Sequence, residues 1–286
     1  MVRNSEMSTV SLDAGTPDPR HPSGARSMLT AAGLSPKRSR GQNFLIDPNT
    51  TRRIVELARV EAGEHVIEVG PGLGALTRQL RDAGARVTAI EIDSALAALV
   101  AQTFHGDPMV RVINDDARSV DIAAVTGDEP ARVVANLPYN VATPLLMDIL
   151  AEAAQVRSVF VMVQAEVADR LAAPPGTSDV GGVSLKVAWY GNAEVIRRVP
   201  PTVFYPKPRV DSALVRIVRH PGAPRLGRPE PLFSLIEAGY KQRRKTLRRS
   251  LSAVCPTDVI ESVGVDPGRR AETVTLQEWE SLAAAL

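Results

Sequence analysis

Four polar residues stand at the carboxyl ends of short, mostly aliphatic runs, and their spacing could place them around one ligand. They are Glu68, Glu91, Asp116 and Asn136. Carboxylate and side-chain amide oxygens accept hydrogen bonds, so these residues could bind hydroxyl, amino or cationic groups. Runs of this length and composition are typical of buried strands. If the strands are parallel, all four side chains lie at the edge of the sheet where ligands bind.

A glycine-rich turn, Gly70-Pro71-Gly72-Leu73-Gly74-Ala75, follows the first run and precedes a helical pattern. Alternate glycines permit positive φ and let a ligand lie against the backbone, and the helix N-terminus offers amide donors. The turn also fits the dinucleotide pattern G-x-G-x-x-G/A, with Glu91 as the ribose-binding acid. Glu68 would repel a pyrophosphate and attract a cationic sulfonium, which favours S-adenosylmethionine over NAD. A turn that Glu68 merely caps is the alternative.

Strands alternate with helical patterns through the middle of the chain, which predicts an α/β fold with a doubly wound, Rossmann-like and mostly parallel sheet. Two alternating runs, 193–199 and 212–218, are expected to close the sheet as an antiparallel pair. In this arrangement Glu91 would bind ribose hydroxyls and Asp116 an adenine amino group. Parallel strands are expected at 65–69, 86–91, 109–113, 131–135 and 158–164.

The segment Asn136-Leu137-Pro138-Tyr139 follows the fourth strand and could act on an exocyclic amine. The lone pair of such an amine is delocalised into the ring, so an enzyme that methylates it needs acceptors aimed at the amine hydrogens. The side-chain oxygen of Asn136 and the carbonyl of Leu137 are candidates. Pro138 would fix the backbone, and Tyr139 would offer a face for stacking. The alternative is an ordinary strand-to-turn junction closed by Asn and Pro.

A proline-rich loop at 200–211 presents two aromatic residues beside two cations, namely Phe204, Tyr205, Lys207 and Arg209. A flipped base and its flanking phosphates require this combination. A proline loop with a packed aromatic side chain is the alternative.

Positive charge is concentrated between residues 197 and 250, where 14 Lys and Arg face 3 Asp and Glu although the whole chain carries only +2. Such a region indicates a polyanionic partner. Six of these cations lie between Lys241 and Arg249, on what we expect to be one helix, and no acid is interleaved among them to pair with. The residues expected to contact RNA are Lys207, Arg209, Lys241, Arg243, Arg244, Lys245, Arg248 and Arg249.

The 286 residues, 44% hydrophobic and 23% charged, are typical of a globular protein without a membrane span. One cysteine and four histidines argue against a disulfide framework and against a zinc site.

The N-terminal stretch lacks the apolar core of a secretory signal, so a cytoplasmic location is expected. Residues 1–36 are rich in Ser, Pro and Gly and are expected to be disordered. The basic stretch 37–47 should lead into a helix that begins near Asp47 and Pro48.

Together these motifs are similar to those of the ribosomal RNA adenine dimethyltransferase family. The resemblance runs from about Gly41 to the C-terminal helices. It implies a methyltransferase domain at 37–228 that uses S-adenosylmethionine, and a helical RNA-binding domain at 229–286. The motifs are Gln42-Asn43-Phe44-Leu45, Glu68 to Thr77, Glu91-Ile92-Asp93, Asp116-Ala117, Asn136 to Asn140, Pro206 to Ser212 and Gln242 to Thr246.

The resemblance also implies the reaction, which is four methyl transfers to N6 of two adjacent adenosines in a hairpin loop near the 3′ end of 16S rRNA. The products are N6,N6-dimethyladenosines, and the partner is the assembling 30S subunit. Phe204 would stack on the base opposite Tyr139, and the methyl would move by direct in-line displacement without a metal. The expected donor-site residues are Asn43, Leu45, Glu68, Gly70, Gly72, Glu91, Asp116 and Asn136.

Two other functions compete with this one. A methyltransferase of the macrolide-resistance type shares the fold and chemistry but acts on large-subunit rRNA. A non-catalytic RNA- or DNA-binding factor in ribosome assembly or transcription would keep the fold without the reaction. The intact Asn136 and donor motifs favour catalysis, and the absence of an evident interface patch favours a monomer.

Overall fold

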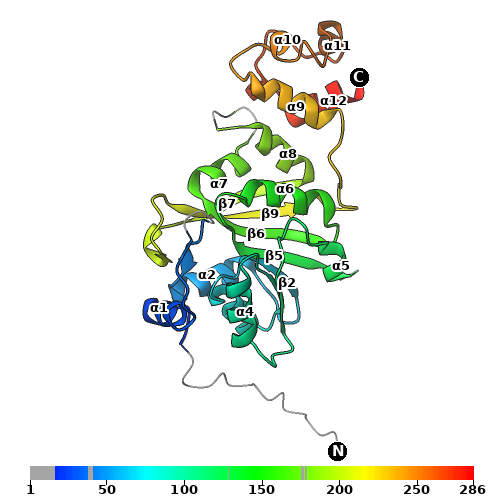
Figure 1. The fold of residues 1–286 in the computed structure, drawn as a ribbon. Coiled ribbons are helices and arrows are strands. Elements are labelled where there is room, and N and C mark those ends of the chain that lie inside the picture. The colour runs from blue at the N-terminus through cyan, green and yellow to red at the C-terminus, as the bar shows by residue number, and fades with distance from the viewer. Residues whose placement is uncertain (1–16, 38–40, 128, 175–176, 178) are drawn as a thin grey trace, which may run out of the picture.

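A computed structural model describes residues 17–37, 41–127, 129–174, 177 and 179–286 (Figure 1). Its centre is a seven-stranded sheet of order β4-β3-β2-β5-β6-β9-β7, and β1 and β8 form a separate two-stranded sheet. The strands are β1 (Phe44–Leu45), β2 (His65–Val69), β3 (Arg86–Ile90), β4 (Val110–Ile113), β5 (Ala131–Asn136), β6 (Val156–Gln164), β7 (Gly191–Val199), β8 (Phe204–Tyr205) and β9 (Ser212–Arg219).

The sheet has the predicted doubly wound topology. Strands β2 to β6 pair in parallel, whereas β9 is antiparallel to both β6 and β7. The predicted α/β fold with a closing antiparallel pair is therefore confirmed. Because parallel strands share one direction, the carboxyl ends of β2, β3, β4 and β5 lie at the same edge of the sheet.

Helices connect the strands, and polar caps start several of them. The carboxylate of Asp47 accepts from the amide of Thr50 at the start of α2, as the sequence predicts, and Asp93 caps α4 in the same way. The helices are α1 (Pro22–Ala31), α2 (Pro48–Ala58), α3 (Ala75–Asp82), α4 (Ser94–Thr103), α5 (Ile122–Thr126), α6 (Ala142–Glu152), α7 (Ala165–Ala172), α8 (Gly182–Tyr190), α9 (Leu232–Lys241), α10 (Leu247–Ser250), α11 (Thr257–Ser262) and α12 (Leu276–Ala284), with 3-10 turns η2 (Pro201–Val203) and η3 (Ala271–Thr273).

Each face of the sheet is covered by its own set of helices. Successive side chains of a strand point to opposite faces, so Val133 and Val134 of β5 belong to different clusters. Val133 packs in a cluster with Leu146 of α6, and Val134 packs in a cluster with Leu76 of α3. All four side chains are almost fully buried. Burial on both faces makes the sheet a rigid platform for the residues at its edge.

The C-terminal helices α9 to α12 lie at one end of the molecule, coloured orange to red in Figure 1. Phe233 of α9 makes edge-to-face contacts with Trp189 and Tyr190 of α8, with ring centroids 5.8 and 6.0 Å apart. Leu185 of α8 and Ile236 of α9 are fully buried in the same cluster. The helical region therefore packs on the sheet domain through a continuous apolar contact.

The disorder expected for residues 1–36 is wrong for the part of that segment that the structure describes. Helix α1 buries Ala25, Met28 and Leu29. Ala25 and Leu29 share a cluster with Leu73 and Leu96, which lie far away in the sequence. A local composition argument misses these distant apolar partners. Residues 1–16 lie outside the described residues.

The single helix expected for the cations from Lys241 to Arg249 is also wrong. Helix α9 ends at Lys241, and α10 begins only at Leu247 after a turn. The backbone amide of Leu247 donates to the carbonyl of Arg269, 2.7 Å away, and that of Arg248 to the carbonyl of Pro267, 3.0 Å away. These hydrogen bonds to a distant segment replace the continuation of the helix.

No helix in the described part of the chain is long and apolar enough to cross a membrane. The same residues contain no cluster of His, Cys, Asp and Glu that could hold a metal ion.

Candidate active site

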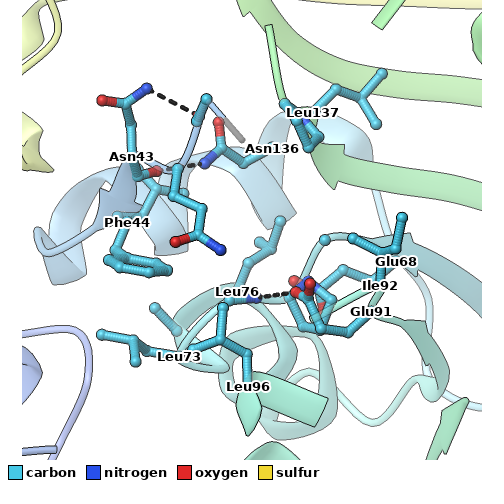
Figure 2. A pocket seen from close by; sticks show the side chains of 18 of the residues that line it. Asn43, Phe44, Glu68, Leu73, Leu76, Glu91, Ile92, Leu96, Asn136 and Leu137 are labelled. Carbon is cyan, nitrogen blue, oxygen red and sulfur yellow. Dashed lines mark hydrogen bonds between the residues drawn. The ribbon is translucent and has the colours of Figure 1, made fainter. Parts of the chain in front are cut away.

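A cleft opens at the carboxyl ends of β2, β3 and β5, between these ends and β1 (Figure 2). The glycine turn forms one wall, and the segment after β5 forms another. Most of the residues expected to bind the donor or the target amine line this cleft. They are Asn43, Leu45, Glu68, Gly70, Gly72, Glu91, Asn136, Leu137, Pro138 and Tyr139.

The glycine turn needs its glycines. Gly70, Gly72 and Gly74 have φ of 70°, 58° and 79°, a region that other residues rarely adopt. A Cβ atom on Gly72 would also lie 2.8 Å from Cδ1 of Phe44. The turn can therefore run directly beside β1, which leaves backbone groups rather than side chains facing the cleft.

Glu68 is a buried acid at the bottom of the cleft, with only 1% of its surface exposed. Its Oε2 accepts a hydrogen bond of 2.6 Å from the hydroxyl of Thr77. Burial raises the pKa of Glu68 to about 8, so without a ligand the carboxyl is mostly protonated at pH 7. At neutral pH, a cation in the cleft would lower this pKa and so favour the negative charge expected for Glu68.

Glu91 joins the glycine turn to the loop after β3. Its Oε2 accepts from the amide of Gly72 at 3.2 Å, and its Oε1 accepts from the amide of Asp93 at 3.0 Å. Figure 2 shows Glu91 beside Ile92 at the cleft wall. Ile92 is 57% exposed, which gives the carboxylate an apolar neighbour suited to a flat ring.

An adjoining pocket shares Gly70, Glu91 and Pro138 with the cleft and contains Asp116, expected to bind adenine. Asp116 is exposed, and its Oδ1 accepts from the amide of Arg118 at 3.0 Å. The two pockets together therefore give an elongated site, in which Asp116 lies beyond Glu91.

Asn136 has a defined amide orientation. Its Nδ2 donates to the backbone carbonyl of Asn43 at 3.1 Å, as the dashed line in Figure 2 shows. A carbonyl oxygen can only accept, so this contact assigns nitrogen to the side of Asn43. The Oδ1 atom of Asn136 therefore faces away from the Asn43 carbonyl and can accept a hydrogen bond from another group. The amide of Leu137 donates to the carbonyl of Met162 at 3.1 Å, which ties the same segment to β6.

Tyr139 stands at the mouth of the cleft and is partly exposed. Its hydroxyl lies 2.6 Å from the Oγ atom of Ser212. Burial of the phenol raises the pKa of Tyr139, so this hydroxyl stays protonated at neutral pH.

Phe204 does not occupy the place that the sequence suggested. It pairs with Leu45 in the small sheet and is 3% exposed, in the same cluster as Val199 and Leu214. Phe204 is not among the described residues that line either pocket. The stacking role expected for Phe204 is therefore not supported in this conformation, because the ring packs in the core.

All eight cations expected to contact RNA are exposed. No acid is interleaved among the cations of the basic segment, as expected, but distant parts of the chain supply two acidic partners. Arg243 lies 3.3 Å from Glu272, and Arg248 lies 4.0 Å from Glu261. Ion pairs this exposed are weak and open easily to solvent, so they leave the cations accessible to phosphate.

Sequence reasoning missed several residues of the site. Gln42, Phe44 and Leu96 line the cleft, and Thr77 holds Glu68. Ile92 had a usable signal, since a large apolar residue directly after a strand-end acid is expected to lie beside the ligand. Thr77 lies in the motif that begins at Glu68, but its hydrogen bond to Glu68 depends on how α3 packs, and Leu96 had no signal because its position depends on α4.

The chain is similar to known proteins over most of its length. The family model for ribosomal RNA adenine dimethylase matches residues 33–286. Ribosomal RNA small subunit methyltransferase A of Bifidobacterium longum (strain NCC 2705) is 44% identical, over 91% of each chain. The protein of the same name from Geobacillus thermodenitrificans is 42% identical, over 93% of this chain and 96% of that one.

Two solved structures share the fold. The 23S rRNA methyltransferase ErmE is 27% identical with a TM-score of 0.66, and the match covers 85% of this chain and 99% of that one. A dimethyladenosine transferase from Plasmodium falciparum is 21% identical with a TM-score of 0.70, over 83% and 95% of the two chains.

Proposed function

Because this chain belongs to the ribosomal RNA adenine dimethylase family, we propose that it methylates N6 of two adjacent adenosines near the 3′ end of small-subunit rRNA. The donor is S-adenosylmethionine, and four transfers yield two N6,N6-dimethyladenosines. The observation that carries this proposal is the amide of Asn136, held by Asn43 so that its oxygen is an acceptor.

The cleft fits S-adenosylmethionine. A cationic ammonium and sulfonium suit the buried carboxyl of Glu68, and ribose hydroxyls suit Glu91 beside Gly72. The adenine ring suits Ile92 with Asp116 beyond it. When bound, this donor supplies an electrophilic methyl group. Asn43, Leu45 and Gly70 complete the set of residues that would hold it.

The residues of the chain orient the amine and exclude water. Asn136 Oδ1 would accept a hydrogen bond from the N6 amine, which directs the nitrogen lone pair along the line of attack. The ring of Tyr139 would stack on the base. The proton would leave to solvent or to a backbone acceptor, since no side chain among the described residues of the cleft is assigned as a dedicated base.

The small subunit is favoured over the large subunit by similarity. Relatives named for the small-subunit enzyme are 42% and 44% identical over nine-tenths of the chain, whereas the 23S rRNA methyltransferase ErmE is 27% identical.

The exposed cations of the segment 241–249 would contact RNA phosphates, and Lys207 and Arg209 would lie nearer the base. We further propose that residues 37–228 form the catalytic domain and 229–286 the RNA-binding domain of a cytoplasmic monomer, which acts on the assembling 30S subunit.

The proposal is tested by methyl transfer from labelled S-adenosylmethionine to purified, unmethylated ribosomal subunits. Label in the small subunit alone is the expected result. Label in the large subunit alone would replace this function with that of a resistance-type enzyme. Binding to either subunit without any label would instead indicate a non-catalytic assembly factor.

A further inference from the structure

We propose that Ser212 is a positioning residue that holds the ring of Tyr139 in the orientation that receives the target base. The proposal rests on the function above and adds to it a residue outside the cleft. Its basis is the hydrogen bond of 2.6 Å between Ser212 Oγ and the hydroxyl of Tyr139.

Ser212 is a fixed point in the structure. It is fully buried and begins β9, where it pairs with Gln164 of β6 on one side and Val199 of β7 on the other. The carbonyl of the preceding Asp211 accepts from the amide of Ala165 at 2.9 Å. A side chain held between two neighbouring strands moves little, so its hydroxyl is a stable anchor.

Tyr139 needs such an anchor. It lies after the end of β5 in the segment that leads to α6, and it is partly exposed at the mouth of the cleft. Without a distal contact its ring could rotate about two side-chain torsions. The bond to Ser212 holds the far end of the ring, while β5 holds the backbone near its other end. Because the phenol sits at the ring edge, a contact there leaves the faces of the ring available for stacking.

Among the described residues, the hydroxyl of Ser212 has no hydrogen-bond partner other than Tyr139. Strand β9 buries Ala213, Leu214 and Val215 directly after it. An alanine would fill the position without the cost of burying a polar group. The role of this hydroxyl is therefore its hydrogen bond to Tyr139.

The test is a double-mutant cycle with Ser212→Ala and Tyr139→Phe. Methyl transfer to small subunits, donor affinity and thermal stability are measured for both single variants and for the double variant. Tyr139→Phe removes the same hydrogen bond but leaves β9 unchanged, so the cycle stays informative if Ser212→Ala folds poorly. Ser158→Ala is the matched control, because Ser158 pairs with Val218 at the opposite end of the same β6–β9 ladder.

Each single variant is expected to lower kcat by about three- to tenfold, the loss that corresponds to one hydrogen bond. The double variant should lose no more than either single variant, and donor affinity should stay at the wild-type value. A wild-type kcat in Ser212→Ala, or losses that multiply in the double variant, would overturn the role of Ser212. Ser158→Ala should match the wild type.

A second readout needs no turnover and keeps this inference separate from the proposed function. The chain has four tyrosines, so ring 13C labelling gives few signals, and Tyr139 is identified by its absence from Tyr139→Phe. In Ser212→Ala the Tyr139 signals should shift and show faster ring motion, and in Ser158→Ala they should not. Unchanged Tyr139 signals would refute the anchor, whereas failure of the wild type to label small subunits would refute only the proposed function.

Discussion

The donor cleft and the basic segment from Lys241 to Arg249 hold their functional groups in opposite ways. In the cleft Glu68 and Glu91 are 1% and 5% exposed, and each has a fixed hydrogen-bond partner. In the basic segment all six cations are exposed. We therefore expect the cleft to act through geometry and the basic segment to act through its electric field.

The two regions should therefore respond differently to substitution of their residues. A positioned acceptor in a cleft loses its effect when it moves by a fraction of its hydrogen-bond length. An exposed cation contributes to RNA affinity additively and with little dependence on its exact place. Chemistry and RNA affinity should accordingly separate when the two regions are changed one at a time.

The largest effect is expected for Asn136→Ala, which removes the acceptor in the cleft. We expect kcat to fall by about 10²- to 10³-fold, the usual cost of losing one positioned electrostatic group. RNA affinity should be nearly unchanged. Single-turnover methyl transfer and filter binding measure the two quantities. Asn192→Ala, at an exposed position of β7, is the control. A wild-type rate in Asn136→Ala would show that the amide does not direct the amine.

The second prediction concerns the basic segment from Lys241 to Arg249. Changing Arg243, Arg244, Arg248 and Arg249 together to Gln should weaken RNA binding and reduce the slope of log affinity against log salt by about 3, if each contacts one phosphate. The maximal rate at saturating RNA should stay close to that of the wild type. The matched control is the same change of charge at the exposed arginines Arg86, Arg111, Arg157 and Arg170. An unaltered salt slope would place the phosphate contacts elsewhere.

A smaller effect is expected for Gly72→Ala, because the new Cβ would meet Phe44 and the residue would keep a positive φ. Donor affinity should fall by roughly tenfold, measured by calorimetry. Gly33→Ala is a matched control, since Gly33 has φ of 64° with no atom within 4 Å of its added Cβ. It carries similar backbone strain without the contact, so its donor affinity should be unchanged. Equal losses in both variants would assign the effect to strain alone.

The last effect concerns pH. Burial raises the pKa of Glu68 to about 8 in the folded protein, against an ordinary value of 4.5 for a glutamate in water. A carboxyl with a raised folded pKa contributes stability at low pH that is lost as pH rises from about 4.5 to about 8. A cationic donor favours the carboxylate, so binding releases a proton below pH 8.

Donor affinity should therefore rise with pH from 6 to 8, by less than tenfold per pH unit, and then level off. In Glu68→Gln, which titrates no carboxyl, this part of the dependence should disappear and the unfolding free energy should lose its decline over the same range. Calorimetry in two buffers of different ionisation enthalpy measures the released proton. A proton release equal in the two proteins would contradict the assigned pKa.

The parts of the site that depend on chain topology could be predicted from the sequence. Glu68, Glu91 and Asn136 follow strand ends, and parallel strands bring such ends together wherever the helices lie. The glycine turn was equally predictable, since positive φ at alternate positions leaves few other structures. The same reasoning predicted Asp116 at this edge of the sheet, and the structure places it in the adjoining pocket.

The parts that depend on packing could not be predicted. The local sequence does not tell which face of β8 is buried, so Phe204 was expected at the cleft although its ring lies in the core. Helix α1 forms against Leu73 and Leu96, and the basic segment breaks where Leu247 bonds to Arg269. Each of these outcomes depends on a partner from a distant part of the chain.

The identity of the modified nucleoside shows whether the Asn136 oxygen directs the N6 amine of adenine toward the methyl group. Small subunits methylated by the wild type would be digested to nucleosides and analysed by mass spectrometry against standards, beside subunits treated with Asn136→Ala. We predict N6,N6-dimethyladenosine at two adjacent positions with the wild type and nearly none with the variant. Methylation at a ring nitrogen or carbon of adenine, or on ribose, would show that the Asn136 oxygen does not direct the N6 amine.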